Sequence, residues 1–111
     1  LPISILQPHG PLFFGSIEPL FNIYSNAPKH KMLIIDLKYI DMIDVSGVYA
    51  LEDLIEINKS NKIDTLVTNS NPQIKNILDK LNFIQHIEKK YYKNSKESIS
   101  DFIIKTFNLN N

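Results

Sequence analysis

Cysteine is absent from this sequence of 111 residues, which excludes disulfide bonds and thiolate metal sites. Long apolar runs are also missing, since none approaches the roughly 20 residues needed to span a bilayer. The 12 basic and 12 acidic residues cancel, so we expect no nucleic-acid partner, because phosphate binding needs a positive excess. A hydrophobic share of 43% suffices for the core of one domain of ordinary size.

Glycine is scarce as well, and Gly10, Gly15 and Gly47 are scattered along the chain. They cannot form a glycine-rich phosphate cradle, so at most weak nucleotide binding at a helix N-terminus is expected. The three histidines lie far apart and lack neighbouring ligand residues at metal spacing, so we expect no metal site. The segment around Ser46 lacks the first glycine of a hydrolase elbow, and no acid–histidine pair completes a triad. We therefore expect neither an enzyme nor a cofactor.

Short apolar runs alternate with amphipathic segments. Strands are predicted over the ranges 3–6, 12–14, 32–37 and 63–67, with a short edge strand over 83–87. Four helices are predicted. The first follows Ser16 as its N-cap and has Pro19 in its first turn. The second follows the turn at 44–47, the third follows Asn71, and the last is capped by residues 94–98. The short connection between the first two strands predicts an antiparallel hairpin. The later alternation predicts an α/β fold with a mostly parallel sheet.

Two segments indicate where the core lies. The run from Met32 to Leu37 shows no polar alternation, which is typical of a central strand covered on both faces. In the helix that follows residue 44, apolar side chains recur on one face. The inward set is Val48, Leu51, Leu54 and Ile55, and the outward set is Glu52, Asp53 and Glu56.

The turn from Asp44 to Gly47 carries the main candidate site. Ser46 places a hydroxyl at a helix mouth, where unpaired N–H groups and partial positive charge collect. The residue is a phosphorylation switch, part of an anion site, or a plain helix cap. Gly47 weakens a helix so near its start, which indicates the close approach of a partner or of a neighbouring loop. Asp36, Asp41 and Asp44 are interpreted as carboxylates that cap turns.

Two segments together resemble one known family. They are Gly10 to Ser16, which reads GPLFFGS, and Ile40 to Leu51, which reads IDMIDVSGVYAL. The pair is similar to STAS domains, and more narrowly to the cytoplasmic C-terminal STAS domains of SulP/SLC26-type sulfate and anion transporters. The Gly-Pro-Leu-Phe-Phe-Gly entry is typical of the transporter branch. The Ile-Asp-x-Ser/Thr-Gly turn is shared with the anti-sigma factor antagonists.

The resemblance extends over nearly the whole chain and implies its architecture. We expect residues 1–111 to form a single STAS domain, excised from the C-terminus of a membrane transporter. The family implies an α/β fold in which a mixed, mostly parallel sheet of about four to five strands is packed with about four helices.

The resemblance also assigns roles to the turn. In the antagonist branch a partner kinase phosphorylates the serine at the position of Ser46, and the phosphate disrupts the partner complex. Asp44 precedes this serine as the motif expects. Tyr49 stands where the antagonists tend to have glycine, which departs from that branch. The implied site therefore comprises Ser46 as regulatory residue, with Asp44, Gly47 and Tyr49 in the turn and the partner contact.

The function implied is that of a non-catalytic regulatory and assembly domain of a SulP-type sulfate transporter. It would lie on the cytoplasmic side of the inner membrane, as part of an integral membrane protein. Its expected partners are the transmembrane domain of the same transporter, a regulatory protein or a second copy of the chain. The alternative is a free-standing anti-sigma factor antagonist that is switched by serine phosphorylation.

Overall fold

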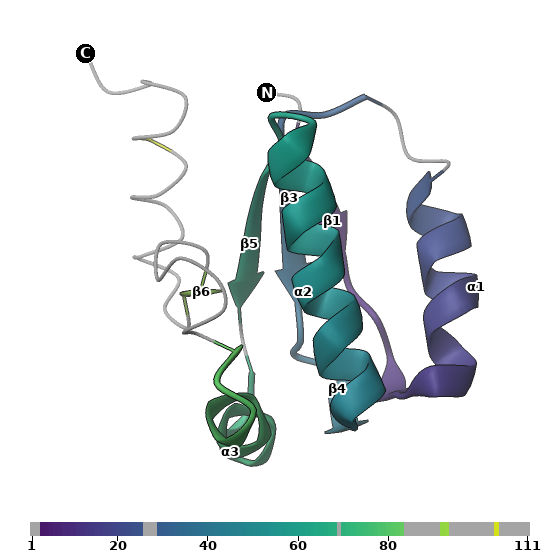
Figure 1. Ribbon diagram of the computed structural model, residues 1–111, viewed down its shortest axis with the longest axis vertical. Coiled ribbons are helices and arrows are strands. Elements are labelled where there is room, and N and C mark those ends of the chain that lie inside the picture. The colour runs from purple at the N-terminus through teal and green to yellow at the C-terminus, as the bar shows by residue number, and fades with distance from the viewer. Residues whose placement is uncertain (1–2, 26–28, 69, 84–91, 94–103, 105–111) are drawn as a thin grey trace.

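The computed structural model describes residues 3–25, 29–68, 70–83, 92–93 and 104 (Figure 1). Strands and helices alternate along most of this length. In chain order the elements are β1 (Ile3–Leu6), β2 (Gly10–Leu12), α1 (Phe14–Ser25), β3 (Met32–Asp36), β4 (Ile40–Ile43), α2 (Val45–Ser60), β5 (Asp64–Thr68), α3 (Pro72–Lys80) and β6 (Tyr92–Lys93).

The described strands form two separate sheets, and all paired strands within each sheet run parallel. The larger sheet has the order β1-β3-β5-β6, and β2 pairs separately with β4. The predicted α/β fold with a mostly parallel sheet is confirmed. A short strand at 40–43, directly before the candidate turn, was not predicted from the sequence.

The predicted antiparallel hairpin between the first two strands is wrong. β1 pairs with β3, with Ile3 opposite Met32, whereas β2 pairs with β4. Gly10 redirects the chain between them, because it adopts a φ of 79° and donates its N–H to the carbonyl of Tyr39 over 3.0 Å. The short connection therefore carries β2 away from β1 to a different partner.

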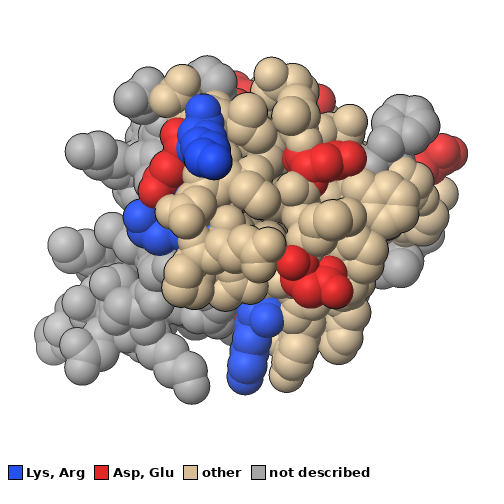
Figure 2. Space-filling view, turned by 90° about the horizontal axis from the view of Figure 1, so that it is seen from below, with Lys and Arg blue, Asp and Glu red and all other residues tan. Residues whose placement is uncertain are grey.

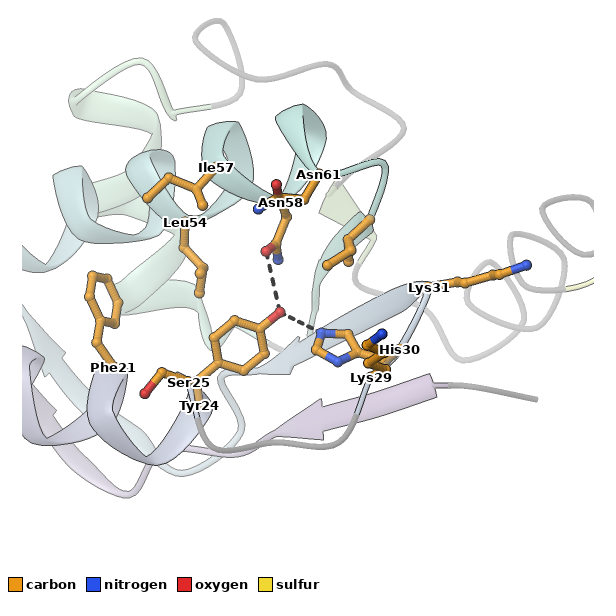
Figure 3. A pocket seen from close by; sticks show the side chains of 11 residues that line it. Phe21, Tyr24, Ser25, Lys29, His30, Lys31, Leu54, Ile57, Asn58 and Asn61 are labelled. Carbon is orange, nitrogen blue, oxygen red and sulfur yellow. Dashed lines mark hydrogen bonds between the residues drawn. The ribbon is translucent and has the colours of Figure 1, made fainter.

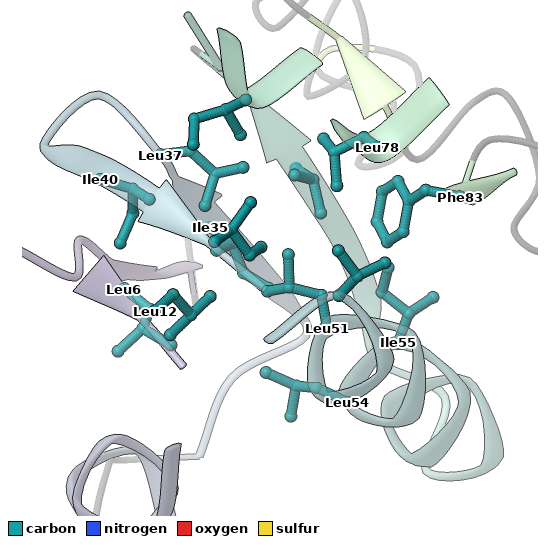
Figure 4. Packing of buried hydrophobic residues seen from close by; sticks show 14 of the residues in the cluster. Leu6, Leu12, Ile35, Leu37, Ile40, Leu51, Leu54, Ile55, Leu78 and Phe83 are labelled. Atoms are coloured by element: carbon teal, nitrogen blue, oxygen red, sulfur yellow. The ribbon is translucent and has the colours of Figure 1, made fainter. Parts of the chain in front are cut away.

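The main core lies between the sheet and the helices (Figure 4). It contains Leu33 and Ile35 of β3 and Val67 of β5, together with the predicted inward face of α2. On the other face of the same strands, Met32, Ile34 and Leu66 form a second buried cluster. The prediction that the central strand is covered on both faces is confirmed. Of the outward set of α2, Asp53 and Glu56 are exposed and Glu52 is half-buried.

The start of α1 differs from its prediction. β2 ends at Leu12, and after the single residue Phe13 the helix begins at Phe14, so Ser16 lies inside the first turn and is not the N-cap. Pro19 consequently falls in the helix interior, where its missing N–H leaves the carbonyl of Gly15 without the usual helical donor. The start of α3 is confirmed, because the Asn71 side chain accepts the N–H of Ile74 over 2.8 Å and Pro72 follows.

Two predictions fall mainly outside the described residues. They are the edge strand over 83–87 and the last helix, of which only Phe83 and Ile104 are described. Phe83 is fully buried in the main core. β6 pairs with β5 at the edge of the larger sheet.

Candidate partner-binding surface

The turn that leads into α2 is held by Asp44. This residue has an extended backbone, and its Oδ1 accepts the N–H of Gly47 over 2.8 Å. Its carbonyl accepts the N–H of Val48 over 3.0 Å, and its own N–H donates to the carbonyl of Leu12 over 3.2 Å. Asp44 is therefore the N-cap of α2, and it also ties the helix start to β2.

Ser46 is the second residue of α2 and does not cap it, so the plain-cap interpretation is wrong. The reason is geometric, because the N-cap is the non-helical residue before the first turn, and Asp44 occupies that place. Ser46 is half-buried, and its hydroxyl forms no hydrogen bond within the described residues. An anion site here is disfavoured, since the Asp44 carboxylate already occupies the helix N-terminus.

Gly47 is buried, and the structure shows what approaches it. A Cβ at this position would lie 2.4 Å from the carbonyl oxygen of Leu12 and 2.8 Å from Cγ1 of Ile43. The close approach inferred from the sequence thus comes from the backbone of β2 and a side chain of β4. Gly47 therefore allows β2 and β4 to pack closely against the start of α2, and the approach comes from within the domain and not from a partner.

Three large apolar side chains beside the turn are exposed to solvent. Met42 is 50% exposed, Val45 48% and Tyr49 52%. Val45 and Tyr49 are four residues apart on α2 and therefore share one face of the helix. We call Met42, Val45, Ser46 and Tyr49 the α2 entry surface.

Several acidic side chains close in sequence to the α2 entry surface are exposed. Asp41, Asp44 and Asp53 are exposed. Seen from the end of the molecule where α2 begins, uncharged atoms cover most of the described surface, and acidic groups and lysine side chains stand apart on it (Figure 2). The face is suited to a partner that buries apolar area and avoids additional negative charge.

Asp36 is engaged within its own turn and with a neighbouring side chain. Asp36 caps its own turn, since its Oδ1 accepts the N–H of Lys38 over 2.9 Å, and its Oδ2 accepts from Nε2 of Gln7 over 2.9 Å. The capping interpretation of Asp36 and Asp44 is confirmed. Among the described residues, no group of three histidine or acidic side chains could hold a metal ion.

No helix in the described ranges combines the length and the apolar composition needed to cross a membrane. Several solved structures have a fold similar to that of this chain. A crystal structure of a sulfate transporter family protein from Wolinella succinogenes has a TM-score of 0.77 at 18% identity, covering 92% of this chain and 85% of that one. The SulP transporter STAS domain from Vibrio cholerae has a TM-score of 0.74 at 19% identity, covering 96% of this chain and 84% of that one.

A third similar structure is much longer than this chain. The murine Solute Carrier 26 family member A9 anion transporter, in its inward-facing state, has a TM-score of 0.76 at 18% identity. The match covers 91% of this chain but 17% of that transporter.

No curated protein matches the sequence. The STAS domain family matches residues 2–98. The chain therefore belongs to the STAS domain family.

Proposed function

We propose that the chain is the cytoplasmic regulatory and assembly domain of a SulP-type sulfate or inorganic anion transporter. It acts without catalysis, through contacts of the α2 entry surface. The observation that carries this proposal is the exposure of Met42, Val45 and Tyr49 around the unbonded hydroxyl of Ser46. Burial of such side chains against a partner is favourable, because each removes apolar area from water.

The similar structures guide the choice of partner. Two of them bear names of sulfate or SulP transporters, and a third is a whole anion transporter that contains a region of this fold. We infer that the transmembrane domain of the same protein is the partner of the α2 entry surface. The domain would then lie at the cytoplasmic side of the inner membrane, and residues 1–111 would be one domain of a longer chain.

Phosphorylation of Ser46 would weaken this contact. A phosphate adds about −1.5 to −2 charge at neutral pH. Asp41 and Asp44 are already negative and exposed beside Ser46. A docked apolar partner would therefore bury additional charge without a cation to balance it.

The alternative function is that of a free-standing anti-sigma factor antagonist. The unbonded hydroxyl of Ser46 favours it, since a kinase could reach a group that no described side chain holds. The exposed ring of Tyr49, four residues after Val45, favours a permanent apolar contact with a partner domain. It therefore favours the transporter domain over the antagonist.

The test is anion uptake by the whole protein in which this chain occurs. Tyr49→Asp and Ser46→Glu are expected to lower sulfate uptake severalfold at equal protein level, because each adds a charge to the α2 entry surface. Ile5→Asp is the matched control, since Ile5 is 67% exposed on β1, away from α2. Equal uptake by the wild type, both variants and the control would exclude a role of this surface.

A further inference from the structure

A cavity of about 670 Å³ lies at the far end of α2 from the α2 entry surface. It opens between the C-terminal parts of α1 and α2 and the segment before β3 (Figure 3). Along α2, about 12 Å of helix separates Tyr49 from Ile57 at the cavity. The two features are therefore distinct.

The walls of the cavity are mainly apolar. Phe21 contributes from α1, and Leu54 and Ile57 contribute from α2. Ile57 is 54% exposed at the mouth, so part of its side chain is open to solvent. Cavities of about 300–1,000 Å³ with apolar walls and a few polar groups are the kind that hold small molecules.

The polar groups converge on Tyr24. Its hydroxyl donates to Oδ1 of Asn58 over 3.3 Å and contacts Nε2 of His30. Asn58 is buried and donates from Nδ2 to Oγ1 of Thr65 over 2.9 Å. A phenol has one proton to donate and an oxygen that also accepts, so the Tyr24 hydroxyl can bond to Asn58 and His30 at the same time. The arrangement holds Tyr24 as a neutral, fixed wall of the cavity.

The charge at the cavity is positive. Lys29 stands beside His30 at the mouth, while Lys31 extends away from it (Figure 3). Neither lysine makes an ion pair within the described part of the chain. Among the described residues that line the cavity there is no aspartate or glutamate. The field at the mouth therefore favours a negatively charged ligand.

We propose that this cavity binds a small amphipathic monocarboxylate, with its aliphatic chain between Phe21, Leu54 and Ile57 and its carboxylate beside Lys29. The apolar walls bury the aliphatic chain of the ligand, and the Lys29 ammonium attracts its carboxylate. This site is independent of the proposed role of the α2 entry surface.

Binding of hexanoate, octanoate and decanoate to the 111-residue chain tests the proposal by titration calorimetry. Each added methylene should tighten binding about three- to fourfold, because it buries more apolar area. Octanoate should bind several times more tightly than 1-octanol, which has the same chain without the charge. Binding that does not depend on chain length, or equal binding of octanoate and 1-octanol, would overturn the proposal. So would the absence of binding up to the solubility limit.

Two variants locate the site. Lys29→Glu should weaken octanoate binding at least tenfold and leave 1-octanol binding unchanged, whereas Ile57→Asp should weaken both. Lys80→Glu and Ile5→Asp are the matched controls, since both side chains are exposed away from the cavity. The four substitutions are at exposed positions, so the melting temperature should change little. Octanoate binding that is equal in Lys29→Glu and Lys80→Glu would place the ligand elsewhere and overturn the assignment.

Discussion

Gly47 is constrained at the scale of a single residue. It lies in the first turn of α2, where glycine lowers helix stability by about 1 kcal/mol relative to alanine. The structure explains its presence, because a Cβ at this position would lie only 2.4 Å from the carbonyl oxygen of Leu12. The backbone of β2 therefore determines which residue the helix can carry.

We expect Gly47→Ala to destabilise the fold by about 1–3 kcal/mol, since β2 or α2 must shift to relieve the contact. The gain in helix propensity offsets only part of this cost. Gly15→Ala is the control, because its Cβ would meet only the side chain of Phe13, at 3.0 Å. Urea unfolding measures both variants. A Gly47→Ala variant as stable as Gly15→Ala would show that the packing beside Leu12 is looser than described.

At the scale of an element, α2 depends on the residue before it. Asp44 caps the helix through Gly47 and bonds to β2 through Leu12, so it joins two elements. Ser46 lies within the helix, and its hydroxyl takes no part in this capping. Capping therefore belongs to Asp44, whereas the proposed regulatory role falls on Ser46.

Asp44→Ala should lower the free energy of unfolding by about 0.5–2 kcal/mol, the usual range for a lost N-cap. Asp44→Asn should retain most of the stability, since an amide oxygen can accept the same N–H. Ser46→Ala should leave it nearly unchanged. The measurement is chemical denaturation at neutral pH. A loss in Ser46→Ala as large as that in Asp44→Ala would contradict the assignment of the cap.

At the scale of the whole molecule, one polar network joins elements that are distant in sequence. It links Tyr24 of α1 to His30 before β3, to Asn58 of α2 and to Thr65 of β5. Burial raises the pKa of Tyr24, and the hydrogen bond to Asn58 opposes this in part. The phenol thus keeps its proton in the folded state at a pH where the unfolded chain loses it.

This shift predicts a loss of stability in alkali. As the pH rises above about 10, the ordinary pKa of tyrosine, the unfolded chain releases the Tyr24 proton first, so stability falls until the folded pKa is passed. The stability of the wild type relative to Tyr24→Phe should therefore decrease over this range. Tyr49→Phe is the control, because that ring is 52% exposed. Parallel pH profiles of wild type and Tyr24→Phe would contradict the prediction.

Much of the fold could be predicted because its signals are local. The apolar run of β3, the inward face of α2 and the Asn71–Pro72 start of α3 are each encoded within a few neighbouring residues. Prediction failed where the outcome depends on distant partners. The connection between β1 and β2 was short enough for a hairpin, but each strand found its partner beyond α1.

For the candidate site the division is similar. The turn at Asp44 to Gly47 and the need for a close approach at Gly47 could be read from residue type alone. The sequence could not distinguish Asp44 from Ser46 as the cap, because both side chains can accept a helical N–H. It also gave no sign of the cavity, since the residues that converge on Tyr24 come from separate elements.

The sequence by itself determined the α/β class, the STAS family and the position of the turn before α2, because periodicity, caps and motifs are properties of adjacent residues. Only the tertiary structure decided which strands pair, which backbone meets Gly47 and what surrounds Tyr24. Those outcomes depend on contacts between residues far apart in the chain, and such contacts form only when the whole core packs.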